Sequence, residues 1–395
     1  MRTLNQQNFK NQRVIIRVDF NVPLNEALEV TDRTRIEAAK PTIDYILEQG
    51  GSCVLLSHLG RPKGNDLKLS LSHIVETVAD VLGRPVKFCS TTVGDAAEAA
   101  AKNLEQGTVL LMENLRFHKE ETAGDILFSE KLARLGTFYV NDAFGTAHRA
   151  HASTTIIANL FKDNKCFGIL LEKEVIAIEK VMEKGEKPIL AILGGAKVSS
   201  KITIIESLLE KVDHLIIGGG MVYTFTKALG GQVGNSICEP DYCDYALELL
   251  EKAKAKGVEI HLPVDVLAGD DFSNDATQKT FDVMNIPDGW EAMDAGPESQ
   301  VLFHNLILKC KTILWNGPMG VFEFSNFSKG TIAAGDSIAE ATQAGAFSLV
   351  GGGDSVAAVK QFGFENKMSY ISTGGGAMLE SLEGKILPGI AALNE

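Results

Sequence analysis

Short runs of apolar, mostly β-branched residues alternate along the whole chain with segments that carry apolar residues at helical spacing. Runs of this kind are typical of strands buried on both faces of a parallel sheet, and the segments between them suit crossover helices. The alternation therefore predicts an α/β protein built on doubly wound (Rossmann-like) parallel sheets. The predicted strands are residues 13–18, 52–57, 86–89, 108–112 and 137–141, followed in the second half by 188–193, 214–218, 258–264, 312–316, 347–351 and 369–373.

The length of the chain divides this pattern into two domains. A chain of 395 residues is longer than one hydrophobic core usually serves. Between the two sets of strands, Leu171, Val175 and Ile178 recur at the spacing of one helical face. We expect two domains joined by a helix, with a cleft between them: an N-terminal domain at residues 1–170, the helix at 171–186 and a C-terminal domain at 187–379.

The two halves differ in charge. Residues 1–170 hold 20 Lys and Arg against 20 Asp and Glu, so the formal net charge of −13 belongs entirely to residues 171–395. All arginines lie at or before Arg149, whereas the three Gly-Gly-Gly triplets lie in the second half. The negative net charge argues against nucleic acid or an anionic membrane surface as the main partner.

The N-terminal residues contain no apolar stretch of the kind found in secretory signals, and no run approaches the roughly 18 apolar residues of a membrane span. We therefore expect a cytoplasmic protein. Six cysteines are scattered without a CxxC pair, which indicates neither a zinc site nor a disulfide framework. No ligand set adjoins His73, His214, His261 or His304 in the sequence, and we expect these histidines to be structural.

Glycine-rich segments follow the predicted strands of the second half. They begin GGAK at residue 194, GGG at 218, NGPMG at 316, GGGDS at 351 and TGGG at 373. Ligands bind at the carboxyl ends of parallel strands, where glycine lets a backbone approach closely and a helix N-terminus offers N–H groups to phosphate. Tight strand-to-helix packing explains any single glycine turn equally well, but five turns at one sheet edge indicate a nucleotide.

Charged residues accompany these turns. Lys197 ends the first of them and Lys201 follows one helical turn later, either as charges for a phosphate or as a solvated pair. Asp354 is either a helix N-cap or, beside phosphates, a Mg²⁺ ligand. Glu323 lies in an apolar run and is placed to accept hydrogen bonds from ribose hydroxyls. The dinucleotide and P-loop glycine motifs are both missing, so neither type of site is expected.

The predicted strands of the first half end differently, in basic and polar residues. A single surface arginine has no special meaning, but guanidinium groups at successive strand ends suit a carboxylate or a phosphate. The four segments are RVDFNVPL (Asp19, Asn21), SHLGRPKG (His58, Arg61), ENLRFH (Asn114, Arg116, His118) and NDAFGTAHRAHAS (His148, Arg149, His151).

Arg35 is an exception to ordinary helix design. The residues Thr34–Glu37 (TRIE) match a capping box, which places Arg35 in the first helical turn, where a cation opposes the helix dipole. A bound anion would relieve this repulsion, and simple tolerance of the charge is the alternative.

Taken together and in this order, the motifs of both halves resemble phosphoglycerate kinase over the whole chain. The resemblance implies a cytoplasmic glycolytic enzyme, generally monomeric, that moves a phosphoryl group between 1,3-bisphosphoglycerate and MgADP. Its partners would be small molecules, with no nucleic acid and no membrane. The C-terminal tail, residues 380–395, would pack back on the N-terminal domain.

The resemblance also implies a role for each matching residue. The triose ligand would be held by Asp19, Asn21, Arg35, His58, Arg61, Arg116 and Arg149. The nucleotide site would be lined by Gly194, Gly195, Lys201, Gly219, Gly296, Pro318, Glu323, Gly351, Gly352, Gly353, Asp354 and Ser355, with Asp354 orienting Mg²⁺. The moving phosphoryl group would be faced by Lys197, Arg35 and the helix start at Gly374, Gly375 and Gly376.

The chemistry is consistent with this resemblance. An acyl phosphate has a carboxylate leaving group, so its cleavage needs no general acid, and the protein mainly positions the ligands and stabilises charge. Two ligands held by different domains would require hinge closure. Two alternatives stay open: a two-domain kinase for another small acid, and an anion-binding protein that closes without chemistry. The segments MVYTF and GNSICEP depart from the family pattern, which leaves the preferred base open.

Overall fold

The computed structural model describes residues 1–394, and the chain folds into two compact units. The first unit consists of Met1–Val175 together with the C-terminal segment from Ile386, and the second consists of Ile176–Lys385. Helix α6 (Ile169–Met182) carries the chain from the first unit into the second, where the sequence predicts a joining helix. No helix within residues 1–394 combines the length and the apolar character that crossing a membrane requires.

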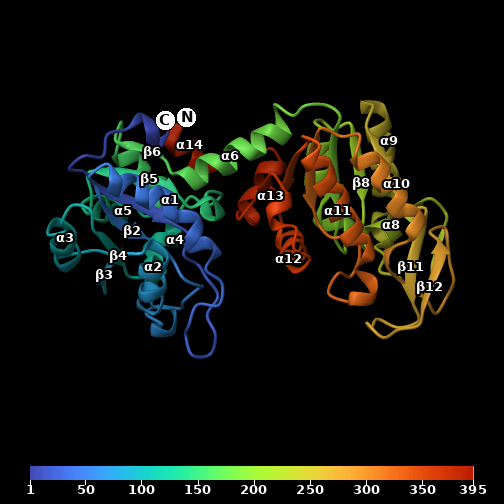
Figure 1. Cartoon of the computed structure of the whole chain (residues 1–395), viewed down its shortest axis with the longest axis horizontal. Helices are drawn as coiled ribbons and strands as arrows, with labels where there is room; N and C mark the ends of the chain where they lie inside the picture. The colour runs from blue at the N-terminus through green and yellow to red at the C-terminus, as the bar shows by residue number, and fades with distance from the viewer. Residues whose placement is uncertain (395) are drawn as a thin grey trace. The chain divides into compact units, whose positions relative to one another are not determined.

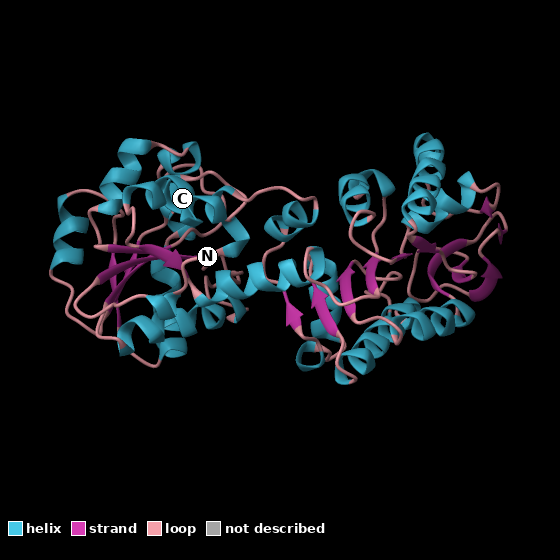
Figure 2. Ribbon diagram, turned by 90° about the horizontal axis from the view of Figure 1, so that it is seen from above, coloured by secondary structure: helices cyan, strands magenta, loops and turns pink. Residues whose placement is uncertain are grey.

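The first unit is built on a six-stranded, all-parallel sheet in the order β3-β4-β2-β1-β5-β6. Helices cover both faces of this sheet (Figures 1 and 2). The strands are β1 (Arg13–Val18), β2 (Ser52–Leu56), β3 (Val86–Cys89), β4 (Val109–Met112), β5 (Phe138–Asp142) and β6 (Lys165–Phe167). The helices are α1 (Thr34–Glu48), α2 (Val75–Leu82), α3 (Asp95–Lys102), α4 (Lys119–Ala123), α5 (Ile126–Ala133) and α14 (Pro388–Asn394).

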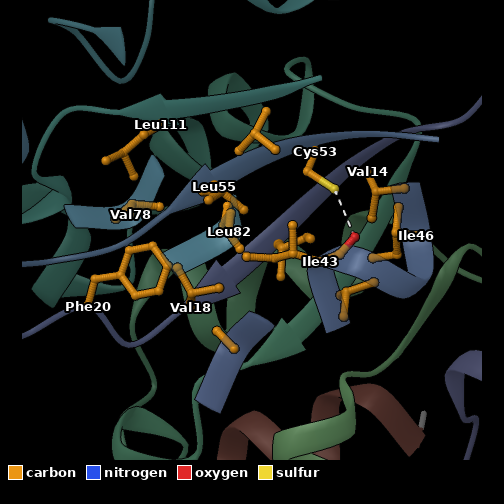
Figure 3. Packing of buried hydrophobic residues seen from close by; sticks show 14 of the residues in the cluster. Val14, Val18, Phe20, Ile43, Ile46, Cys53, Leu55, Val78, Leu82 and Leu111 are labelled. Carbon is orange, nitrogen blue, oxygen red and sulfur yellow. Dashed lines mark hydrogen bonds between the residues drawn. The ribbon is translucent and has the colours of Figure 1, made fainter. Parts of the chain in front are cut away.

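The core of the first unit fills the space between the sheet and helices α1 and α2 (Figure 3). Val14 and Val18 of β1 pack there with Leu55 of β2, and Ile43 projects from α1. The Cys53 thiol lies among them, 4.0 Å from the carbonyl oxygen of Ile43. Burial raises the pKa of this thiol, so Cys53 behaves as a small apolar side chain.

The second unit contains another six-stranded, all-parallel sheet, in the order β10-β8-β7-β15-β16-β17. Both sheets confirm the predicted fold class. The strands are β7 (Ile189–Leu193), β8 (His214–Ile217), β10 (Glu259–His261), β15 (Thr312–Asn316), β16 (Phe347–Val350) and β17 (Tyr370–Ile371). The helices are α7 (Ile202–Leu208), α8 (Met221–Ala228), α9 (Cys243–Lys256), α10 (Pro297–Ile307), α11 (Lys329–Gln343), α12 (Gly353–Gln361) and α13 (Gly376–Leu382).

Sequence analysis missed several short strands. Strand β6 pairs with β5 at the edge of the first sheet and has only three residues. In the second unit, β11 (Asp265–Gly269) forms an antiparallel sheet with β12 (Gln278–Asp282) and β14 (Glu291–Ala295), and β9 (Gln232–Val233) pairs with β13 (Asn285–Ile286). Strand β12 is mostly exposed and polar, so it has no apolar run by which to recognise it.

Helix α14 packs on the first unit although it follows the second unit in the chain. The Gly389 N–H donates to the carbonyl oxygen of Ala147 at 2.8 Å, and the ammonium of Lys165, itself buried, donates to the carbonyl oxygen of Ala392 at 2.7 Å. The side chain of Leu393 is fully buried. The core of the first unit is therefore completed by residues from the far end of the sequence.

Replacing Leu393 by alanine is expected to destabilise the first unit by about 2–5 kcal/mol, since the change leaves a cavity where a buried leucine was. Amide hydrogen exchange of peptides from β5 and β6, followed by mass spectrometry, reports this unit separately. Ile386→Ala is the matched control, because the Ile386 side chain is 84% exposed and its loss should change stability by less than about 0.5 kcal/mol. Equal exchange in the two variants would contradict the proposed contribution of α14.

Candidate active site

The strand β1 and helix α1 bring three predicted residues together in the first unit. A guanidinium nitrogen of Arg35 lies 3.1 Å from a carboxylate oxygen of Asp19 and donates to the carbonyl oxygen of Asn21 at 3.0 Å. The Asp19 carboxylate also accepts the Asn21 N–H at 3.3 Å. The side chain of Arg35 is 37% exposed. One guanidinium nitrogen therefore contacts Asp19 and Asn21, and the side chain remains accessible to a ligand.

The predicted capping box at Thr34–Glu37 is wrong. Helix α1 begins at Thr34 itself, and Arg33 occupies the N-cap position without a capping hydrogen bond from its side chain. The Thr34 N–H is accepted by the Asp32 carboxylate at 2.8 Å. The positive charge of Arg35 nevertheless lies in the first helical turn, where the neighbouring carboxylate of Asp19 offsets its repulsion with the helix dipole.

Gly60, in the loop after β2, connects Asn21 after β1 to Arg116 after β4. Its N–H donates to the side-chain oxygen of Asn21 at 2.7 Å, and its carbonyl oxygen accepts from the guanidinium of Arg116 at 2.8 Å. Asn114, which is buried, ties down the same loop by donating to the carbonyl oxygens of Leu59 and Leu69, both at 2.8 Å. The loops after β1, β2 and β4 are therefore fixed to one another by side chains.

A pocket of about 770 Å³ opens at this edge of the first sheet. Three predicted arginines, Arg61, Arg116 and Arg149, line it together with His118 and His151. The remaining lining residues are Pro62, Gly64, Phe117, Lys119, Glu120 and Thr122. An open pocket with three guanidinium groups suits a small ligand that carries phosphate and carboxylate groups.

Sequence analysis missed the buried network beneath this pocket. Arg17 projects from β1 and is fully buried; its guanidinium donates to the Ser153 hydroxyl at 2.8 Å and contacts Nδ1 of His58 at 3.2 Å. Ser153 in turn donates to the buried carboxylate of Glu121 from its N–H and its hydroxyl. The available signal was Arg17 between the apolar residues of the run VIIRV, because a buried charge needs partners.

Both histidines near Arg17 are held in the neutral form. Burial, and then the charges of Arg17, Arg116 and Arg35, hold the pKa of His58 well below its usual range. Burial, then the charges of Arg116, Arg17 and Arg149, lower the pKa of His151 to about 4. His58 is only 3% exposed and lies beside Arg17. The positive charge that faces the pocket therefore comes from arginines and not from imidazolium groups.

In the second unit, the glycines at the strand ends let three turns interlock. A Cβ atom on Gly194 would lie 1.9 Å from the carbonyl oxygen of Pro318, and one on Gly317 would lie 2.2 Å from that of Gly194. Gly219 has a φ of +65°, and a Cβ there would lie 2.8 Å from the backbone nitrogen of Gly195. The space beside Gly194 is thus filled by the backbone of the neighbouring loop.

Polar side chains lock these turns to the following helices. The Lys201 ammonium donates to the side-chain oxygen of Asn316, whose amide donates to the carbonyl oxygen of Gly351 at 2.8 Å. The fully buried Ser355 accepts the N–H of Gly317 through its hydroxyl. Burial lowers the pKa of Lys201, and the negative charge of Asp354 opposes that shift.

A second pocket, of about 380 Å³, lies among these turns. Of the predicted nucleotide residues, it is lined by Gly195, Gly219, Pro318, Glu323 and Asp354. Sequence analysis did not predict the other lining residues, which are largely apolar: Ala196, Gly220, Tyr223, Ile237, Phe272, Glu291, Ala292, Met293, Gly320 and Val321. This mixture of exposed backbone, three carboxylates (Glu291, Glu323 and Asp354) and apolar side chains suits a flat ring joined to a polar tail.

The other predicted residues of the second unit lie outside this lining. Lys197 is exposed and precedes the short turn Val198–Ser200. Gly296 is the N-cap residue of helix α10, and a Cβ there would meet the Asp265 carboxylate at 2.3 Å. Asp354 is not an N-cap, since Gly352 holds that position in α12. The outside residues are Gly194, Lys197, Lys201, Gly296, Gly351, Gly352, Gly353, Ser355, Gly374, Gly375 and Gly376.

The buried side chain of Asp294 packs behind Gly320, one of the residues that line the second pocket. Its buried carboxylate accepts the N–H groups of Ala295 and Gly330, at 2.9 and 2.8 Å. A Cβ on Gly320 would lie 2.3 Å from the same carboxylate, so only glycine fits there. Burial raises the pKa of Asp294 to about 7 in spite of these hydrogen bonds.

Two parallel-sheet units, one with an arginine pocket and the other with a glycine-lined pocket, suit an α/β enzyme that acts on small phosphorylated ligands. The family model for phosphoglycerate kinase matches residues 4–385. The chain therefore belongs to the phosphoglycerate kinase family and is a phosphotransferase.

Relatives and solved structures agree with this assignment over the full length. A phosphoglycerate kinase of Porphyromonas gingivalis is 52% identical and covers 99% of both chains, and a cytosolic one of Nicotiana tabacum is 50% identical over 100% of this chain and 98% of its own. The structure of the Coxiella burnetii enzyme superposes with a TM-score of 0.91 at 40% identity, over 99% of this chain and 98% of that one. The Pyrococcus horikoshii enzyme gives 0.84 at 31% identity, over 100% and 98%.

The pKa of His151 provides a test of the arginine pocket. In the free protein, the ring should titrate near pH 4 and stay neutral above that, since burial and three arginines disfavour the cation. Adding 3-phosphoglycerate should raise the midpoint, because an anion beside the ring favours the imidazolium. NMR titration of the ring protons, assigned with His151→Gln, measures both values. A midpoint near the ordinary 6.5 in the free protein would contradict the electrostatics described.

Gly194→Ala is expected to destabilise the second unit by about 1–3 kcal/mol or more, because the new methyl group would overlap backbone that cannot move aside. Urea unfolding followed by tryptophan fluorescence measures this, since both tryptophans, Trp290 and Trp315, lie in the second unit. Gly353→Ala is the control, because its Cβ would have no neighbour within 4 Å. Similar midpoints for the two variants would show that the turns do not depend on contact at Gly194.

Proposed function

We propose that the two units divide the phosphoglycerate kinase reaction between them, the first binding the triose and the second the nucleotide. The reaction transfers a phosphoryl group reversibly from 1,3-bisphosphoglycerate to MgADP, giving 3-phosphoglycerate and ATP, in glycolysis and gluconeogenesis. One observation carries the division of roles: Arg61, Arg116 and Arg149 line one pocket in the first unit, whereas the pocket of the second unit is glycine-rich and partly apolar.

In the first unit, the arginines are proposed to grip the phosphate and carboxylate groups of the triose in pairs. Arg35 and Asn21 are proposed to complete this site through the loop at Gly60, which joins them to Arg116. Asp19 orients Arg35. His58 is proposed to act as a neutral hydrogen-bonding group, because a second buried cation beside Arg17 is unfavourable.

In the second unit, Phe272, Tyr223 and Val321 are proposed to contact the nucleotide base. The exposed side chain of Phe272 is 56% accessible and offers a flat apolar face. Glu323 is proposed to accept hydrogen bonds from the ribose hydroxyls. The phosphates would extend along the glycine turns toward Lys201 and α12.

Asp354 is proposed to hold the Mg²⁺ that accompanies the nucleotide. Its carboxylate is exposed at the start of α12 and lines the pocket, and Mg²⁺ prefers one or two carboxylates combined with phosphate oxygens and water. The residues present fit the ion. When bound, Mg²⁺ neutralises part of the phosphate charge.

Transfer itself is proposed to rely on charge stabilisation. The leaving group of the acyl phosphate is a carboxylate, which needs no proton, so the protein requires cations and N–H groups around the moving phosphoryl group. Arg35, Lys197 and the backbone at Gly374–Gly376 are proposed to supply them. Because each ligand belongs to a different unit, the proposal includes closure about a hinge that brings the ligands in line.

Three broader expectations belong to the same proposal. The domain limits expected from the sequence, residues 1–170 with the tail, 171–186 and 187–379, are proposed as the functional parts. We also propose that the protein acts as a monomer and that it is located in the cytoplasm. The name of the cytosolic relative from Nicotiana tabacum supports the location.

The defining experiment is an ATP-consumption assay with 3-phosphoglycerate and Mg²⁺, coupled to reduction of the product. Turnover with 3-phosphoglycerate but not with acetate or carbamate supports the proposal. Preference for acetate or carbamate would indicate a kinase for another small acid, and binding of 3-phosphoglycerate without turnover would indicate an anion-binding protein.

Lys197→Ala is expected to lower turnover by at least about a hundredfold, as removal of one electrostatic stabiliser typically does, while leaving the protein folded because the side chain is exposed. Lys211→Ala is the matched control, since Lys211 is also exposed in the second unit but lies just before β8, at the opposite end of the strands. Steady-state kinetics and thermal melts of both variants test this. Near-normal turnover in Lys197→Ala would remove the residue from the mechanism.

A further inference from the structure

Two histidines and a glutamate on the neighbouring strands β8 and β10 meet in the second unit. His214 is the first residue of β8, and Glu259 and His261 are the ends of β10, which pairs with β8 in parallel with Glu259 opposite His214. Because side chains two residues apart on a strand point to the same face, Glu259 and His261 project together. This end of the sheet is opposite the glycine turns, so the cluster is separate from the proposed nucleotide site.

The distances within this cluster match the coordination sphere of a metal. Nδ1 of His214 lies 3.2 Å from Nε2 of His261 and 3.3 Å from a carboxylate oxygen of Glu259, which lies 3.7 Å from Nε2 of His261. Zinc binds histidine nitrogen and carboxylate oxygen at about 2.0–2.2 Å in tetrahedral geometry, which places neighbouring ligand atoms about 3.3–3.6 Å apart. Three donor atoms thus surround one point at suitable distances.

Without a metal, hydrogen bonds alone leave some of the electron pairs on the two ring nitrogens and the carboxylate oxygen without a partner within this cluster. If Nδ1 of His214 carries a proton, its single N–H is shared between a carboxylate and a second ring nitrogen. A cation accepts all three electron pairs at once. The side chains of His214 and His261 are 20% and 29% exposed and that of Glu259 is 70% exposed, so a cation can enter from solvent and keep a water as its fourth ligand.

We propose that His214, Glu259 and His261 form a binding site for a first-row divalent cation, with Zn²⁺ as the best match. Imidazole ligands favour zinc and its neighbours over Mg²⁺ and Ca²⁺, which prefer oxygen ligands. A metal here ties the edge strand β10 to β8. Its role is to stabilise the second unit, independently of the Mg²⁺ that accompanies the nucleotide.

The test is calorimetric titration of the full-length, chelator-treated protein with Zn²⁺ alone, without nucleotide or Mg²⁺. The wild-type protein should bind one equivalent, and His261→Gln and His214→Gln should each bind at least about a hundredfold more weakly, since even loss of a group that orients a ligand costs 10–100-fold. His73→Gln is the control: His73 lies in the first unit, contacts the carbonyl oxygen of Leu67, and its loss should leave the affinity unchanged.

Two further measurements cover other outcomes. Co²⁺ should give the visible spectrum of nitrogen and oxygen ligands without sulfur-to-metal charge transfer, whereas a charge-transfer band would assign binding to cysteines and overturn the proposal. If the histidine variants fail to fold, Glu259→Gln replaces them, because its side chain is largely exposed; Zn²⁺ should raise the melting temperature of the wild type but raise it less in this variant. Absence of saturable binding to the wild type, or unchanged binding in the folded variants, overturns the proposal.

Discussion

Backbone contact between the turns at Gly194 and Gly317 is the constraint on which the second unit depends. These turns follow the adjacent strands β7 and β15, and the Gly194 N–H also donates to the carbonyl oxygen of Asn316 at 3.0 Å. No side chain fits between them. Their close approach positions Asn316 to hold both Lys201 and Gly351, and it positions Gly317 beside Ser355. Gly194 and Gly317 are therefore needed for the packing of the two turns, whether or not a ligand is bound.

In the first unit, the loops at the strand ends are also fixed to one another, but by side chains instead of by backbone contact. Asn21, Asn114 and Arg116 are bonded to the backbone of the loop after β2. Below them, Arg17 carries a buried positive charge that Glu121 balances through Ser153. Rigid charged groups suit the small, highly charged triose that we propose for the first unit, whereas exposed backbone and apolar walls suit the longer nucleotide that we propose for the second.

Much of the fold was predictable from the sequence because most predicted strands are apolar runs with both faces buried, as in β2, β4, β7 and β15. The same reasoning failed for strands that have no long apolar run. Strand β6 has only three residues, and β12 is mostly exposed and polar. For the site, charged residues at strand ends were found, but the pocket residues Phe272 and Tyr223 were not, since an isolated aromatic residue in a loop or helix carries no pattern. The capping box failed because Asp32, not Thr34, accepts the first free N–H of α1.

The packing of α14 on the first unit has a consequence for synthesis of the chain on the ribosome. Domains generally fold in the order in which they emerge, but Leu393, which the first unit buries, is translated only after the entire second unit. Part of the core of the first unit therefore stays exposed while more than half of the polypeptide is still being synthesised. Nascent chains stalled before residue 386 should accordingly be the forms most dependent on chaperones.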